Sequence, residues 1–117
     1  MSRDHRKLEA FRLADRSVVE LYQITRALPD SERYGLQSQL RRAAVSIPTN
    51  IVEGCSRPAT PDDCRFLTMA HGSAREVCYL LPLCTRLGYL TEPATAKLAG
   101  DYGRTAAMLH GLIDSNS

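Results

Sequence analysis

Residues 32–54 read ERYGLQSQLRRAAVSIPTNIVEG, and the apolar positions in this stretch largely determine the architecture. They recur at steps of three and four residues: Leu36, Leu40, Ala43, Ala44, Ile47 and Ile51. This is the period of an amphipathic helix, so the pattern predicts a helix over residues 32–53, with Gly54 as its C-terminal stop. Pro48 lies inside this helix and has no N–H to donate to Ala44. It predicts a kink near residues 44–46 or, alternatively, a helix break at Ile47.

Three more segments show the same period and predict helices over residues 7–28, 62–87 and 92–115. Their limits are marked by Pro29, by Thr60 and Pro61 as N-cap and first helical residue, and by Gly88. Pro82 predicts a bend in the last turns of the third helix. No segment shows the two-residue period of a strand, and short connections force neighbouring helices to run in opposite directions. The predicted fold is all-α: one antiparallel up-down-up-down four-helix bundle over residues 1–117, with a kinked second helix.

The composition limits the number of domains and the make-up of the core. At 117 residues the chain is long enough for one ordinary domain but not for two. Aromatic residues make up only 6% and tryptophan is absent, so the core must consist mainly of leucine, isoleucine, valine and alanine.

Positive charge is concentrated in the N-terminal half. Residues 1–57 carry ten Lys or Arg against seven Asp or Glu, whereas residues 58–117 carry five against six. Thirteen of the fifteen basic residues are arginine, whose planar guanidinium binds phosphate in a bidentate manner. The predicted nucleic-acid-binding candidates are Arg12, Arg16, Arg26, Arg33, Arg41 and Arg42. The alternative is a solvated face on which acids such as Asp15 and Glu20 offset the arginines.

A polar stripe runs along the predicted second helix. Arg42, Ser46, Asn50 and Glu53 follow one another at steps of four, four and three residues, so they share one edge of the helix. One interpretation is a ligand or phosphate site with Arg42 as its charge. The other is a structural network that satisfies polar groups and fixes helix register, with Arg42 paired to Glu53 or to Glu76.

Two valines of the same helix lie away from its apolar stripe. Val45 and Val52 are seven residues apart and form a second apolar strip, which is what a subunit interface needs. The alternative is that they are two ordinary surface valines.

Catalytic and metal-binding patterns are missing from the sequence. His5, His71 and His110 are scattered, and there is no GxSxG, P-loop or HExxH motif. The four cysteines form no CxxC pair, and two histidines that meet across the last two helices are too few to bind a metal. We therefore expect no enzymatic activity and no cofactor. The charged N-terminus and the lack of a long apolar run predict a cytoplasmic protein without a membrane span.

Four motifs are distinctive: Tyr34-Gly35-Leu36, Gln39-Leu40-Arg41-Arg42-Ala43, Ser46-Ile47-Pro48-x-Asn50-Ile51-x-Glu53-Gly54 and Ala70-x-Gly72-Ser73-x-x-Glu76. In these motifs, and over residues 7–113 as a whole, the chain closely resembles the four-helix-bundle proteins encoded in 23S rRNA intervening sequences. The accessory variability proteins of diversity-generating retroelements belong to the same superfamily.

The resemblance implies a homopentameric barrel with a basic surface, for which binding of RNA or DNA is proposed. In the retroelement branch the pentamer also binds a reverse transcriptase, so a protein-interaction scaffold is the alternative function. By position, the counterparts of the family's signature residues are Arg41, Arg42, Ser46, Asn50, Glu53, Ser73 and Glu76, and we expect their role to be structural. Compared with the nucleic-acid binders of the group, this chain has few lysines and a net charge of only +2.

Overall fold

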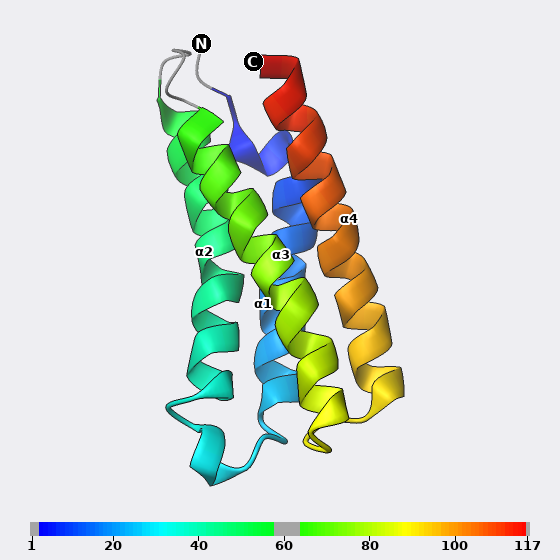
Figure 1. Cartoon of the computed structure of the whole chain (residues 1–117). Helices are drawn as coiled ribbons and strands as arrows, with labels where there is room; N and C mark the ends of the chain where they lie inside the picture. The colour runs from blue at the N-terminus through cyan, green and yellow to red at the C-terminus, as the bar shows by residue number, and fades with distance from the viewer. Residues whose placement is uncertain (1–2, 58–63, 117) are drawn as a thin grey trace.

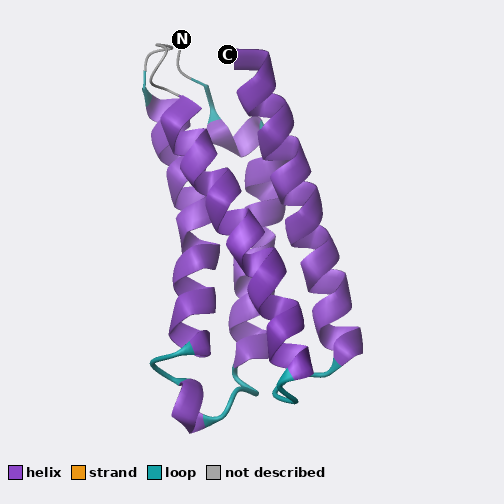
Figure 2. Cartoon of the chain, viewed as in Figure 1, coloured by secondary structure: helices purple, strands orange, loops and turns teal. Residues whose placement is uncertain are grey.

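The computed structural model describes residues 3–57 and 64–116, which form four long helices packed side by side (Figure 1). These are α1 (Glu9–Thr25), α2 (Leu36–Ser56), α3 (Cys64–Arg86) and α4 (Glu92–Asn116), with the short 3-10 turns η1 (His5–Lys7) and η2 (Asp30–Glu32). Within the described ranges there is no strand, as Figure 2 shows. Helix α1 packs against α2 and α4, and α3 packs against the same two helices. The prediction of an all-helical fold with four packed helices is confirmed.

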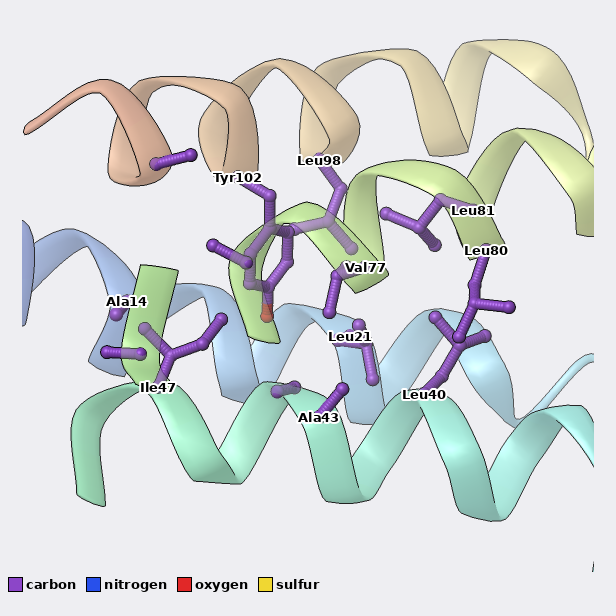
Figure 3. Packing of buried hydrophobic residues seen from close by; sticks show 14 of the residues in the cluster. Ala14, Leu21, Leu40, Ala43, Ile47, Val77, Leu80, Leu81, Leu98 and Tyr102 are labelled. Atoms are coloured by element: carbon purple, nitrogen blue, oxygen red, sulfur yellow. The ribbon is translucent and has the colours of Figure 1, made fainter. Parts of the chain in front are cut away.

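The core lies along the bundle axis and is mainly aliphatic (Figure 3). The stripe predicted for the second helix is buried from Leu40 to Ile51, and Leu36 packs at its end. Each fully buried leucine or isoleucine stabilises the fold by roughly 1.5–3 kcal/mol relative to an exposed position. The largest fully buried side chain among the described residues is Tyr102, whose ring reaches from α4 into the middle of the core.

Helix α2 differs from its predicted bounds at both ends. It begins at Leu36 because residues 30–32 form η2 and residues 33–35 form a turn. The prediction that Gly54 stops the helix is wrong, since α2 continues to Ser56. The reason is burial of the last turn: Cys55 is 4% exposed, and its carbonyl accepts a hydrogen bond from the Arg3 backbone N–H at 2.9 Å.

Pro48 does not interrupt α2, so a break at Ile47 is excluded. Ile47 and Ile51, on either side of the proline, are both fully buried, and this packing holds the helix together. Two side chains after the proline also bond to helix carbonyls: Thr49 Oγ1 donates to the Val45 oxygen at 2.7 Å, and Asn50 Nδ2 donates to the Ser46 oxygen at 2.8 Å. Helix α3 is likewise continuous through Pro82. The bends expected at the two prolines remain predictions.

The other helix ends agree more closely with the sequence. Helix α1 is shorter than residues 7–28 at both ends, whereas α4 begins at Glu92 as expected. Gly88 has φ +80° and follows α3; the Tyr89 N–H donates to the Cys84 oxygen at 2.9 Å and the Gly88 N–H to the Thr85 oxygen at 3.0 Å. This is a Schellman cap, which favours glycine at the left-handed position. The predicted start of the third helix, with Thr60 and Pro61, lies outside the described residues.

Candidate functional site

Three predicted arginines form a row along the exposed side of α1: Arg12 and Arg16 lie in the helix, and Arg26 is its C-cap residue. Arg12, Arg16 and Arg26 are four and ten residues apart, which places them within about 80° of arc along roughly 21 Å of helix. All three are exposed, and none forms an ion pair with any residue that the structure describes. Among the described residues, the one side-chain hydrogen bond of this row is long, from Arg12 Nη1 to the Arg6 carbonyl at 3.4 Å.

The cations of α4 behave differently, because they are neutralised within the bundle. Lys97 Nζ lies 3.0 Å from Glu20 Oε2 and 3.3 Å from Asp101 Oδ2, and Arg104 Nη2 lies 2.8 Å from Asp101 Oδ1. Burial of Asp101 raises its carboxyl pKa, but the hydrogen bonds from Arg104 and Lys97 outweigh burial and hold that pKa below its usual value. These cations are therefore less available to an external anion than the arginine row of α1.

Arg41 is held by α1 and serves the fold. Its Nε donates to Thr25 Oγ1 at 3.0 Å, its Nη2 donates to the Tyr22 carbonyl at 3.1 Å, and its guanidinium carbon lies 4.4 Å from the centre of the Tyr22 ring. Gln37 adds a bond from Nε2 to the Thr25 carbonyl at 3.0 Å. The two α2 side chains thus cap the C-terminus of α1, whose last carbonyls carry partial negative charge.

Arg42, the next residue, points into a different environment. It is exposed, and no hydrogen bond or ion pair of its side chain is present in the described part of the chain. It lines a groove of about 490 Å³ between α2 and α3. The other side chains along this groove include Tyr34, Ser38, Gln39, Ser46, Ser73 and Glu76. Tyr34 is 90% exposed, and the Arg33 guanidinium carbon lies 5.8 Å from the centre of its ring.

Only part of the network predicted for the polar stripe is formed among the described residues. Ser46 Oγ and Ser73 Oγ are 3.0 Å apart and link α2 to α3, and Asn50 Nδ2 donates to Ser46 Oγ at 2.9 Å. The expected pairing of Arg42 with Glu53 or Glu76 is not formed between these described residues. Instead, Glu53 Oε2 lies 3.3 Å from Arg57 Nη2, and Glu76 Oε2 accepts a bond from Gln39 Nε2 at 3.1 Å. Only the serine–asparagine part of the stripe therefore forms a network.

The two valines predicted as interface residues lie on a second groove, of about 320 Å³, between α1 and α2. Val45 and Val52 line it from α2, and Val18 and Val19 line it from α1. Val19 is 59% exposed and Val45 is 41% exposed, so the apolar strip is accessible on this chain. Its availability for a partner is consistent with the interface interpretation.

The described residues offer few other candidate groups for catalysis or metal binding. The rings of His71 and His110 are 6.0 Å apart, and His110 Nε2 lies 3.3 Å from Asp114 Oδ2. Over residues 3–57 and 64–116, no group of three or more potential metal ligands is present. The four cysteines are free thiols, and burial raises the pKa of Cys55, Cys78 and Cys84, which makes them poor nucleophiles. No described helix is long and apolar enough to cross a bilayer.

Sequence reasoning missed how the groove beside Arg42 is built. Glu32 Oε1 accepts the Leu36 backbone N–H at 3.1 Å, and Glu32 Oε2 accepts a bond from the Tyr89 hydroxyl at 3.3 Å. A β-carbon on Gly35 would lie 2.5 Å from Glu32 Oε1, so glycine leaves room for this carboxylate. The turn that results presents Tyr34 to solvent. The sequence signal was present, since Glu32 lies four residues before the first apolar position of α2.

The chain matches a family model over most of its length. The family model described as 23S rRNA-intervening sequence protein matches residues 6–111. No curated protein matches the sequence.

Proposed function

Because the chain belongs to the 23S rRNA-intervening sequence protein family, we propose that it is a non-enzymatic protein that binds RNA or DNA through arginine-rich surfaces. The observation that carries the proposal is the arginine row of Arg12 and Arg16 on α1 and Arg26 at its C-cap, which forms no ion pair with any described residue. The contrast with α4 supports it, because there the cations Lys97 and Arg104 are held by acidic side chains.

The chemistry of the row suits a phosphate backbone. Arginines without internal ion pairs can replace the counterions of a nucleic acid, and release of those counterions drives binding that depends strongly on salt. No base-specific contact is needed for such an interaction. Arg33 and Arg42 are also exposed and form no ion pair in the described segments, so they extend the candidate surface.

We also propose that the chain assembles into a homo-oligomer, with the family's homopentamer as the expected form. The exposed apolar groove formed by Val18, Val19, Val45 and Val52 is the candidate contact. An assembly bearing several arginine rows compensates for the net charge of only +2 on one chain. Light scattering tests this directly: a mass about five times the 13.0 kDa of one chain is expected, and Val45→Asp should lower it. A monomeric wild type would reject the assembly.

The binding proposal is tested by fluorescence anisotropy with labelled RNA and DNA at low salt. The variant is the triple substitution of Arg12, Arg16 and Arg26 by alanine. The matched control is the triple substitution of Arg65, Arg75 and Arg86, which removes the same charge from α3. Weaker binding by the α1 variant alone supports the proposal. Absence of binding by the wild type, or equal loss in both variants, contradicts it.

The second candidate function is a scaffold that docks a protein partner such as a reverse transcriptase, in which case that partner, and not a second copy of the chain, covers the valine groove. This function requires association that survives nuclease treatment. The test is co-purification of the tagged chain with a reverse transcriptase encoded beside its gene, with Val19→Asp as the variant that should abolish association. Loss of association on nuclease treatment would instead indicate that nucleic acid bridges the two proteins.

A further inference from the structure

The groove between α2 and α3 combines groups that together suit a single nucleotide unit. Its volume of about 490 Å³ falls in the range of small-molecule sites. It is lined by one cation, Arg42, by one carboxylate, Glu76, and by uncharged hydroxyl and amide groups. Tyr34 stands at the same groove with 90% of its surface exposed, which is unusual for so large an aromatic side chain.

From these groups we infer that the α2–α3 groove binds an unpaired nucleotide of a single-stranded nucleic acid, with the base stacked on Tyr34 and the phosphate on Arg42. The inference rests on the proposed nucleic-acid binding and specifies which form of nucleic acid is recognised. Stacking on aromatic rings is available only to bases that have left a duplex. The arginine row of α1, in contrast, requires only phosphates.

Tyr34 is prepared for stacking by its neighbours. Arg33 lies over the ring, with 5.8 Å between its guanidinium carbon and the ring centre, so this cation adds charge beside the platform. The turn that carries Tyr34 is fixed by Glu32, which is bonded to both Leu36 and Tyr89. Because the carboxylate occupies the space beside Gly35, the backbone at the tyrosine is held in a defined turn. A defined backbone turn reduces the conformational freedom that is lost when a base stacks on the ring.

The polar groups distinguish the two ends of a nucleotide. Arg42 has no internal partner in the described part of the chain, so a phosphate can approach it without breaking an existing ion pair. Glu76 repels phosphate but accepts hydrogen bonds from base N–H groups. Its Oε2 already accepts from Gln39, while Oε1 has no hydrogen bond to a described residue. The Ser46 and Ser73 hydroxyls, which are 3.0 Å apart, line the same groove.

The test compares three probes: a labelled single-stranded RNA of mixed sequence, the same strand annealed to its complement, and the same strand with abasic sites. Tyr34→Ala should weaken binding of the intact single strand about tenfold, the loss of one stacked base. It should leave duplex and abasic binding unchanged. Tyr34→Phe should retain single-strand binding, because the ring remains. The matched control is Tyr79→Ala, which removes another exposed tyrosine (62% exposed) outside the groove.

Two results overturn the inference while leaving the proposed function intact. One is that Tyr34→Ala weakens single-strand and duplex binding equally, and the other is that it weakens neither. Arg42→Ala should weaken binding of the single strand more than Arg86→Ala, and equal effects also count against the groove. A wild-type protein that binds none of the probes at low salt rejects both the inference and the proposed function. Circular dichroism of each variant confirms that it is folded.

Discussion

Replacing Arg41 by alanine should destabilise the bundle, whereas replacing its neighbour Arg42 should not. The structure gives Arg41 two hydrogen bonds of 3.0 and 3.1 Å to α1 and a stacked position on Tyr22, and it gives Arg42 none. Hydrogen bonds from charged groups contribute roughly 1.5–3 kcal/mol each when buried, and less where water competes. A cation–π contact at an exposed site adds roughly 0.5–1 kcal/mol. Because Arg41 is only partly buried, we expect a loss of about 2 kcal/mol for Arg41→Ala.

That loss is large relative to the whole, since domains of this size are stable by about 5–15 kcal/mol. Urea denaturation followed by far-UV circular dichroism measures it as a shift of the midpoint by about 1 M or more. Arg42→Ala should change the free energy of unfolding by less than about 0.5 kcal/mol. Arg41→Lys keeps the positive charge but loses the bidentate guanidinium and its stacking on Tyr22. Its free energy of unfolding should therefore lie between those of Arg41→Ala and Arg42→Ala. Equal stabilities for Arg41→Ala and Arg42→Ala would refute the assignment of Arg41 as the cap of α1.

Three further predictions follow from the same contacts. The Tyr102 hydroxyl is buried without a hydrogen-bond partner among the described residues, so Tyr102→Phe should raise the free energy of unfolding by about 1 kcal/mol; a destabilised variant would mean that the hydroxyl is satisfied in solution. The pKa of Asp101 lies below its usual 3.8, so the carboxylate stabilises the fold above about pH 4 and this contribution is lost as the pH falls through the lowered pKa. Asp101→Asn should therefore be less stable than wild type at pH 7 and converge with it in acid, and a constant difference across pH would contradict this linkage. Gly35→Ala should displace the Glu32 carboxylate and lower the melting temperature, which differential scanning calorimetry measures, while Gly72→Ala, where a β-carbon meets nothing within 4 Å, should not.

Periodicity predicted the fold because burial of apolar stripes outweighs local details of the chain. Every apolar position of the α2 stripe from Leu40 to Ile51 is buried, and even Pro48 does not break a helix whose neighbours Ile47 and Ile51 are fixed in the core. The helix ends were less predictable. Gly54 is a favourable stop by local preference, but burial of Cys55 carries the helix past it.

The contacts of the candidate arginines could not be predicted from the sequence. Arg41 and Arg42 are adjacent in sequence, yet they point about 100° apart around the helix. Arg41 therefore contacts α1, whereas Arg42 lines the groove between α2 and α3. Their partners depend on how the helices pack, which periodicity does not determine. The prediction that Arg42 pairs with an acid failed for the same reason, because Gln39 reaches Glu76 and Arg57 reaches Glu53. In contrast, the strip of Val45 and Val52 was predictable because it depends on one helix alone.

The salt dependence of RNA binding tests the central claim most directly. For the wild-type protein, the logarithm of the binding constant should fall steeply and linearly with the logarithm of salt concentration. Alanine at Arg12, Arg16 and Arg26 should make that slope shallower by at least about two, since each lost phosphate contact removes roughly 0.7–0.9. Equal slopes for the wild type and the triple variant would contradict the assignment of this arginine row as the phosphate-binding surface.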